Sequence, residues 1–306
     1  MMDKTNKNNL KNIDFGRTDL AVENSEKFKK DNVEIKGVEI YKEKYLDNKI
    51  LITRVEINTN YGAGVMEKPI GTYTTIESRF FTAEDKMFHH EAALIIAKEI
   101  RKLIIKKYGK INGNNKTFLV AGLGNRDITA DALGPKVVEL VNVNSNIYAI
   151  SPGVMARSGM ESASIIKGIV KEVKPDFVIA IDSLAARNTS RLNTTIQITD
   201  TGISPGSGVG NHRCGLNEES IGVPVIAIGV PMVVNAATIV NDALENLLNA
   251  INASELISTF SREERFRLSA EIIEPVMCTM FVTTDHIDEN VSIMAETIAE
   301  SLNSLA

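Results

Sequence analysis

Three continuous runs of apolar residues constrain the fold of this chain more than any other feature. The runs lie at 117–121, 176–181 and 223–230. Uninterrupted Val/Ile runs are typical of parallel strands whose two faces are both covered, whereas strands with one solvated face alternate apolar and polar residues. Helical spacing at 135–141 and 161–171, between the first two runs, fits this pattern. The sequence therefore predicts an α/β fold with a mostly parallel sheet.

The segments around these runs predict further elements. Residues 33–78 alternate apolar and polar side chains in short stretches, which predicts a small antiparallel β-layer. Residues 83–107 carry apolar side chains at helical spacing. The remaining predicted elements are a short strand at 146–150, an edge strand at 194–199, a helix at 236–250, a charged segment at 261–265, a short strand at 281–283 and a final helix at 287–305.

Composition excludes several classes of protein. Hydrophobic residues make up 43% of the 306 residues and charged residues 24%, as in an ordinary globular chain. The net charge of −5 provides no basic surface for direct nucleic-acid binding, and the absence of tryptophan disfavours a stacking platform for single strands. Two cysteines, Cys214 and Cys278, are too few for a disulfide framework.

Neither a membrane span nor an export signal is predicted. The longest apolar stretch, 223–234, is shorter than a membrane-spanning helix and contains Pro224, Gly229 and Pro231. The first dozen residues are rich in Lys and Asn and lack the apolar segment of a secretory signal. We therefore expect a cytoplasmic protein with no membrane partner.

The loop at 122–135 follows the first apolar run and reads GLGNRDITADALGP. Gly122 and Gly124 permit a tight turn, but Asp127 stands where a dinucleotide-binding GxGxxG turn needs its third glycine. Asp131 precedes a predicted helix, so it is either the N-cap of that helix or a functional carboxylate. Ligands of open α/β sheets bind outside the carboxyl ends of the strands, where this loop is expected.

Asp182 directly follows the second apolar run. A carboxylate at the end of a buried strand is costly to desolvate unless it is paired or used in function. The spacing between Asp131 and Asp182 fits one β-α-β-α-β passage, which would bring the two together if their strands are neighbours. Because two adjacent carboxylates do not both ionise easily, one keeps a proton. Such a pair can activate a water with one group and protonate a carbonyl oxygen or a leaving amine with the other.

A third loop, 200–211, is rich in glycine and serine. Its backbone N–H groups can cradle an anion or stabilise an oxyanion, although it lacks the GK[ST] ending of a phosphate loop. The alternative is a flexible surface loop. The nearby His212 and Cys214 leave a Cys/His nucleophile pair open. The sequence contains neither HExxH nor CxxC, so we expect no metal and no cofactor.

Together these segments resemble the germination proteases of spore-forming bacteria, a family of unusual aspartic endopeptidases. The resemblance covers nearly the whole chain. It rests on residues 17–23 (RTDLAVE), 35–38 (IKGV), 122–136 (GLGN to DALGPK), 151–155 (SPGVM), 174–177 (KPDF), 179–187 (IAIDSLAAR), 204–211 (SPGSGVGN) and 222–231 (GVPVIAIGVP). It implies a three-layer α/β/α fold similar to the hydrogenase-maturation peptidases, and it implies that Asp131 and Asp182 are the catalytic carboxylates.

The resemblance also implies a substrate and a processing step. Germination proteases cut the small acid-soluble proteins that coat spore DNA, and they are made as inactive zymogens with a short propeptide. Thr18-Asp19-Leu20-Ala21 looks like the cleavage sequence of the family, an acidic residue followed by an apolar residue and Ala. This implies self-cleavage between Asp19 and Leu20.

The implied organisation is a propeptide over 1–19 and one catalytic α/β domain over 20–306, with 30–80 as a small β subdomain. The family further implies a homotetramer in the developing forespore and spore core. Groups expected to contact the substrate or its oxyanion are Gly122, Gly124, Asn125, Arg187, Ser204, Gly206, Ser207, Gly208 and Asn211.

Two alternatives remain open. A hydrogenase-maturation-type peptidase would be guided by a metal on its substrate, and it requires a third ligand for which His212 is the candidate. A nucleotide-binding α/β module would use the Gly-rich loops, and it predicts a thermal shift with dinucleotides and no proteolysis.

Overall fold

The computed structural model describes residues 18–29, 35–109, 116–204, 214–250, 264 and 280–305. Its strands are β1 (Val38–Tyr45), β2 (Ile50–Ile57), β3 (Gly71–Glu77), β4 (Phe118–Gly122), β5 (Ile147–Ile150), β6 (Phe177–Ala186), β7 (Thr195–Thr199), β8 (Val225–Asn235) and β9 (Phe281–Val282). Its helices are α2 (Ala21–Lys29), α3 (Asn60–Met66), α4 (Lys86–Tyr108), α5 (Leu133–Leu140), α6 (Met155–Ser158), α7 (Ser162–Val173), α8 (Glu218–Ile221), α9 (Ala236–Ala250) and α12 (Ile287–Asn303). Short 3-10 turns are η1 (Arg79–Thr82), η2 (Thr129–Asp131) and η3 (Thr189–Arg191).

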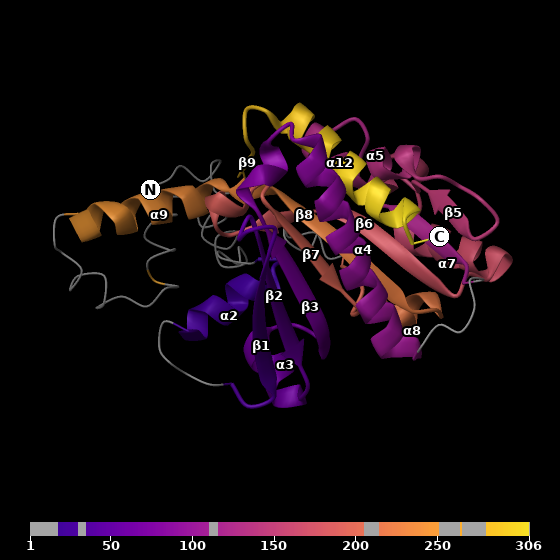
Figure 1. Ribbon diagram of the computed structural model, residues 1–306, viewed down its shortest axis with the longest axis horizontal. Helices are drawn as coiled ribbons and strands as arrows, with labels where there is room; N and C mark the ends of the chain where they lie inside the picture. Colours follow the sequence, from indigo (N-terminus) through magenta and orange to yellow (C-terminus); the bar gives the residue numbers. More distant parts are fainter. Residues whose placement is uncertain are drawn as a thin grey trace, which may run out of the picture.

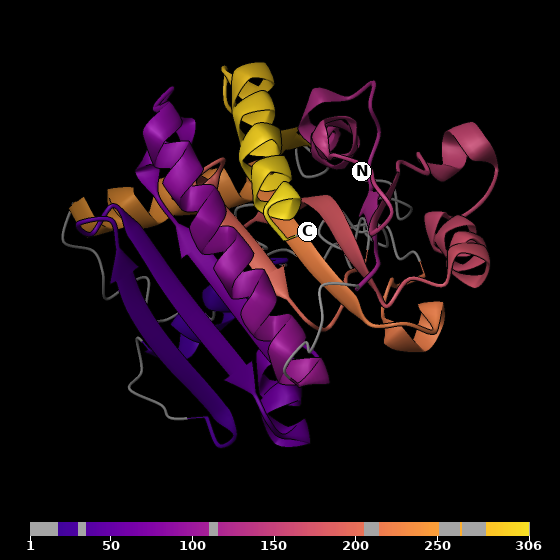
Figure 2. The same cartoon turned by 45° about the vertical axis from the view of Figure 1, so that its right-hand side comes forward.

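The strands form one mixed sheet in the order β1-β2-β3-β7-β8-β6-β4-β5, with β9 paired to β8 (Figures 1 and 2). The pairings among β5, β4, β6 and β8 are parallel, whereas those among β1, β2, β3, β7 and β8 are antiparallel. The α/β class is confirmed. The predicted antiparallel pairing of the N-terminal strands is confirmed. The expectation of a mostly parallel sheet is wrong, because β3 pairs with β7 and the antiparallel strands thus belong to one mixed sheet.

The predicted edge strand, β7, lies inside the sheet between β3 and β8, and all five of its residues are buried. Apolar and polar residues alternate along β7 although neither of its faces is exposed to solvent. Ile196 and Ile198 pack in the main core, while Gln197 and Thr199 face the opposite side and find polar partners there. Alternation therefore marks two different buried environments at β7.

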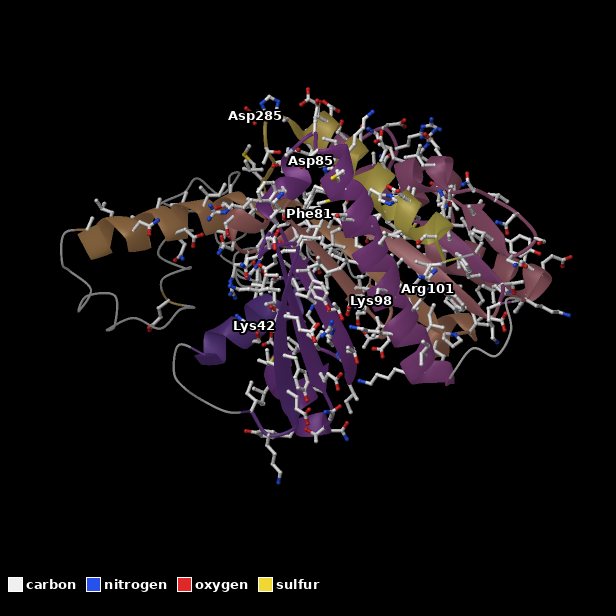
Figure 3. All side chains as sticks on the ribbon, viewed as in Figure 1. Lys42, Phe81, Asp85, Lys98, Arg101 and Asp285 are labelled. Atoms are coloured by element: carbon white, nitrogen blue, oxygen red, sulfur yellow. The ribbon has the colours of Figure 1, made fainter. Side chains whose placement is uncertain are left out.

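One face of the sheet is covered by α4, α5 and α12, which enclose the main core. Figures 1 and 2 show α4 and α12 side by side across this face. Asp85 caps α4 by accepting a hydrogen bond from the N–H of Phe88 at 3.1 Å. The ring of Phe88 packs edge-on against Phe81 of η1. A hydrogen bond and an apolar contact therefore both hold the start of α4, where Figure 3 labels Phe81 and Asp85.

The other face carries two smaller clusters. Under α7 and α8, apolar residues of β4, β6 and β8 pack against Ile166 and Ile221. Over β2 and β3, Ala21 of α2 and Met66 of α3 bury Val55, Ile57 and Tyr73. Helices thus pack against both faces. None of the described helices is long and apolar enough to cross a membrane.

Most predicted helices and strands are confirmed with bounds shifted by a few residues. The antiparallel segment contains one helix that was not predicted, α3. Thr59 is its N-cap, and the Thr59 side chain accepts a hydrogen bond from the N–H of Gly62. The predicted charged segment at 261–265 lies, apart from Glu264, outside the described residues.

Candidate active site

Three glycines bring the loop after β4 against the start of α5. A Cβ atom at Gly122 would lie 2.1 Å from the carbonyl oxygen of Gly134, and one at Gly134 would lie 2.4 Å from that of Leu123. Gly124 has a φ of +107°, and a Cβ atom there would lie 2.0 Å from the carbonyl oxygen of Asp131. The chain's own packing therefore requires these glycines, whether or not a ligand approaches them.

Asp131 is held across this loop. Its Oδ2 accepts a hydrogen bond from the backbone N–H of Asn125 at 2.7 Å. The helix α5 begins at Leu133, and its N-cap is Ala132, which makes no side-chain capping bond. The interpretation of Asp131 as the N-cap of α5 is therefore wrong, and its carboxylate is fixed beside the end of β4 instead.

Asp182 lies in β6 and is only 5% exposed. Val178 and Ala180 pack under α7, so strand alternation places Asp182 on the same face. The register sets Asp182 beside Gly229 of β8, and Gly229 beside Gln197 of β7. Asp182 and Gln197 therefore flank a residue without a side chain, with their Cα atoms about 10 Å apart, or two strand spacings.

The strand before the turn with Asp131, β4, and the strand that carries Asp182, β6, are neighbours, which meets the condition that the sequence left open. β4 and β6 are parallel, with Gly122 opposite Ile181, and the N–H of Leu123 donates to the carbonyl oxygen of Ile181 at 2.8 Å. The turn η2, which ends in Asp131, also packs against β6. Carboxyl ends of neighbouring parallel strands meet at one edge of a sheet, so Asp131 and Asp182 belong to the same end of the molecule.

The N-terminal segment docks against the end of β6. Among the described residues, β4 pairs with β6 no further than Ile181, and Ala185 makes its backbone contacts with Asp19 instead. The N–H of Asp19 donates to the carbonyl oxygen of Ala185 at 3.2 Å, and the N–H of Ala185 donates to Oδ2 of Asp19 at 3.0 Å. Leu20 is fully buried and packs against Leu184. The segment that carries the predicted processing sequence is therefore seated on the part of β6 that follows Asp182.

Glu23 anchors this segment. Its carboxylate, 1% exposed, accepts hydrogen bonds from the backbone N–H groups of Arg187 at 3.0 Å and Asn188 at 2.9 Å. It also pairs with Arg191 at 3.3 Å, and Arg191 in turn binds Glu77 of β3 at 3.1 Å. Arg187, a predicted substrate contact, donates from Nη2 to the carbonyl oxygen of Glu23 at 3.2 Å. It therefore binds the chain's own N-terminal segment.

Two side chains hold the carbonyl oxygen of Asp19. Gln197 donates to it from Nε2 at 3.0 Å, and Lys68 donates from Nζ at 3.2 Å. Gln197 also accepts a hydrogen bond from the N–H of Ala21 at 2.7 Å, and Lys68 also donates to the carbonyl oxygen of Thr18 at 3.2 Å. Burial lowers the pKa of Lys68, an effect that the nearby charge of Asp19 opposes.

A cavity of about 260 Å³ opens beside this carbonyl group. Its lining includes Asp19, Lys68, Leu184, Gln197, Ser204 and Gly229. Tyr73 lies in the same wall, and burial raises its pKa to about 12, so its hydroxyl stays protonated at neutral pH. We call this cavity, together with the end of β6 that binds Asp19, the docking groove.

Lys68 and Gln197 are not among the site residues that the sequence predicted. One signal was present: Gln197 is the single glutamine of the chain, and it stands between two isoleucines in a strand. Lys68 follows an unpredicted helix and carries no sequence signal. Only the approach of the N-terminal segment to β6, β7 and the turn after α3 brings these side chains to one atom.

The third predicted loop is described only in part. Ser204 lines the docking groove, whereas Gly206, Ser207, Gly208, Asn211 and His212 lie outside the described residues, as does Cys278. Cys214 is exposed. In the part of the chain that the structure describes, no group of three His, Cys, Asp or Glu side chains could hold a metal ion.

Comparison with known proteins gives a consistent match. Residues 15–256 match a family model described as germination protease. The chain is 40% identical to a germination protease of Clostridium perfringens, over 94% of both chains. It is 40% identical to one of Caldanaerobacter subterraneus over 94% of this chain and 93% of the relative, and 36% identical to one of Bacillus mycoides over 94% and 92%.

Proposed function

Because the chain belongs to the germination protease family and is therefore a peptidase, we propose that it starts the degradation of small acid-soluble spore proteins during germination. The observation that supports the mechanism is that Asp182 lies in β6, while the turn with Asp131 follows the neighbouring parallel strand β4 and packs against β6. The mildly acidic chain, with a net charge of −5, acts on the proteins that coat DNA and not on DNA itself.

Asp131 and Asp182 share the acid and base work. A carboxylate that is 5% exposed, as Asp182 is, is costly to ionise beside a second carboxylate, so the pair holds one proton between them. The ionised member takes a proton from water as the water attacks the scissile carbonyl carbon. The protonated member then gives its proton to the leaving amine, and the peptide bond breaks.

The same site removes the chain's own propeptide, residues 1–19, and leaves a protein that begins at Leu20. The docked position of Asp19 and Leu20 on β6 supports this step. The three-layer arrangement of hydrogenase-maturation peptidases, a homotetramer, and a place in the forespore and spore core complete the proposal by family resemblance.

Substitution of each aspartate tests the mechanism. The purified full chain is incubated with a small acid-soluble spore protein, and the new N-termini of both proteins are sequenced. We expect Asp131→Asn and Asp182→Asn each to lower both cleavages by about 10³-fold or more, because neither amide can take or give the proton. Asp127→Asn is the matched control, since Asp127 lies in the same loop, is exposed, and pairs with Arg157 on the surface.

Retention of near-normal cleavage by Asp131→Asn or Asp182→Asn, with a native circular dichroism spectrum, would refute the aspartate pair. Absence of any cleavage by the unsubstituted chain, together with a dinucleotide-induced thermal shift, would favour the nucleotide-binding alternative.

A further inference from the structure

The carbonyl group of the predicted processing bond is bound in an unusual way. Asp19 lies in a bend before α2 and belongs to no strand, and its carbonyl oxygen accepts from two side chains, Gln197 at 3.0 Å and Lys68 at 3.2 Å. The two donors come from β7 and from the turn between α3 and β3, which are distant in sequence. Two donors that converge on one carbonyl oxygen, one of them cationic, form the arrangement that stabilises a developing oxyanion.

Gln197 also sets the register of the bound segment. Its Nε2 donates to the carbonyl oxygen of Asp19, and its Oε1 accepts from the N–H of Ala21 at 2.7 Å. The side-chain amide therefore spans Leu20 as a backbone peptide group of a partner strand would. Lys68 donates to the carbonyl oxygens of both Thr18 and Asp19 at 3.2 Å, and Gln197 binds the second of these two.

The acidic side chain before the bond is bound as well. The N–H of Ala185 donates to Oδ2 of Asp19 at 3.0 Å, and the Lys68 ammonium lies at the carbonyl oxygen of the same residue. Favourable Coulomb interaction with Asp19 acts against the burial that lowers the pKa of Lys68. An acidic residue at this position is therefore matched by a backbone donor and a nearby positive charge.

The bound carbonyl group lies on the face of the sheet that carries Asp182. Gln197, Gly229 and Asp182 form one lateral row across β7, β8 and β6. Gly229 has no side chain, and a Cβ atom there would lie 2.4 Å from Leu184, so the Leu184 side chain of β6 occupies the space above Gly229. The carbonyl group that Gln197 holds and the candidate catalytic carboxylate therefore share one face of the sheet, on either side of Leu184.

We infer that Lys68 and Gln197 form the oxyanion-binding pair of this peptidase and hold the carbonyl oxygen of the acidic residue whose bond is cut. The inference rests on the proposed function. Attack by water forms a C–O bond at the carbonyl carbon, and the carbonyl π electrons move to the oxygen that these two side chains bind. Collapse restores the C=O bond and breaks the C–N bond, and the nitrogen of Leu20 leaves with a proton from the aspartate pair.

Both residues are testable in the self-cleavage of the full chain. Full-length protein is made by cell-free translation, and loss of residues 1–19 is followed by mass spectrometry as a first-order rate. In parallel, the docked fraction of the N-terminal segment is measured by its protection from trypsin at Lys27 and Lys29. The variants are Lys68→Met and Gln197→Met, which keep the length of each side chain, and Lys68→Arg.

We expect Lys68→Met and Gln197→Met each to slow self-cleavage by about 10²-fold to 10³-fold, the usual loss for one oxyanion donor. The docked fraction should change much less than the rate, because these donors act mainly in the transition state. Lys68→Arg should retain most of the self-cleavage rate, since arginine keeps a cationic donor at this position. Lys106→Met, which removes a half-exposed lysine paired with Glu56 on the opposite face, should stay within about twofold of the unsubstituted chain.

A normal rate in Lys68→Met, or a rate that falls only in proportion to the docked fraction, would overturn the inference, because either result assigns the pair to docking alone. If Gln197→Met does not fold, Lys68→Met and Lys68→Arg carry the test by themselves. Failure of the proposed function is distinguishable, since the unsubstituted chain would then cleave neither itself nor a spore protein.

Discussion

At the scale of single residues, Gly124 shows how a missing side chain positions a candidate catalytic group. Its φ of +107° is disfavoured for other residues, and its Cα faces the backbone of Asp131. The same turn lets the N–H of Asn125 bind the carboxylate of Asp131 at 2.7 Å. The geometry of Asp131 therefore depends on a residue that makes no chemical contribution of its own.

Gly124→Ala tests this dependence. The new methyl group would lie 2.0 Å from the carbonyl oxygen of Asp131 and 3.0 Å from its Oδ1, so the aspartate must move. We expect the rate of cleavage of a spore protein to fall by roughly 10²-fold, the scale of a displacement of about 1 Å at a catalytic group. The melting temperature should also fall.

The control is Gly168→Ala on the exposed face of α7, where a Cβ atom meets nothing within 4 Å. Alanine favours a helix over glycine by about 1 kcal/mol, so this variant should be slightly more stable and equally active. Normal activity of Gly124→Ala would contradict the positioning role of the turn.

At the scale of elements, the end of β6 and the segment at 18–29 depend on each other. β6 extends beyond its pairing with β4, and this leaves backbone groups at Ala185 that Asp19 satisfies. Glu23 then closes the contact with the N–H groups of Arg187 and Asn188. The docked segment is therefore held by polar anchors at both ends of the buried residues Leu20 and Val22.

Glu23→Gln should loosen this segment. The substitution leaves Arg191, which is 9% exposed, without one of its carboxylate partners, and it turns an amide NH₂ toward N–H donors. Breaking a buried pair of this kind costs about 3 kcal/mol, so the open fraction of the segment should rise by roughly 100-fold. Tryptic cleavage at Lys27 and Lys29 should accelerate in proportion.

Glu39→Gln on the exposed surface of β1 serves as the control. In the described part of the chain Glu39 accepts a hydrogen bond from the neighbouring Tyr41, so the substitution should leave the tryptic rate unchanged. Equal tryptic rates for Glu23→Gln and the unsubstituted chain would show that apolar burial alone holds the segment.

At the scale of the whole molecule, a single sheet joins the N-terminal strands to the candidate active site. β3 pairs with β7, and β7 pairs with β8, so the antiparallel and parallel halves share backbone hydrogen bonds. Ile50, Ile52 and Ile76 of the N-terminal strands also belong to the main core under α4 and α12. Residues 30–80 are therefore expected to unfold together with the rest, and not as a separate subdomain.

Two optical probes can test this cooperativity. The chain has no tryptophan, and four of its six tyrosines lie between 41 and 73, so tyrosine fluorescence reports mainly on the N-terminal strands. Circular dichroism at 222 nm reports mainly on the helices outside that segment. We expect urea unfolding to give the same midpoint and slope with both probes. A fluorescence transition that precedes the helical one would instead support an independent subdomain at 30–80.

The sequence by itself determined much of the local structure. Runs of Val and Ile at 117–121, 176–181 and 223–230 predicted β4, β6 and β8, because such residues in succession suit strands buried on both faces. Asp182 was predicted to be functional because a carboxylate at the end of a buried strand is costly without a role, although β6 continues past it to Ala186. The spacing of Asp131 and Asp182 allowed the two to meet if their strands were neighbours, and the pairing of β4 with β6 meets that condition.

Only the tertiary structure decided how the parts meet. The alternation of apolar and polar residues shows that the two faces of β7 differ, but it does not show what covers each face. For this reason a strand that is buried on both sides was predicted at the edge of the sheet. Whether Asp131 caps α5 or holds its carboxylate beside β4 depended on the residue at which α5 begins. The packing of Gly134 against Leu123 sets that residue. Lys68 and Gln197 converge on one carbonyl oxygen from segments over one hundred residues apart, and such convergence arises only when the chain is folded.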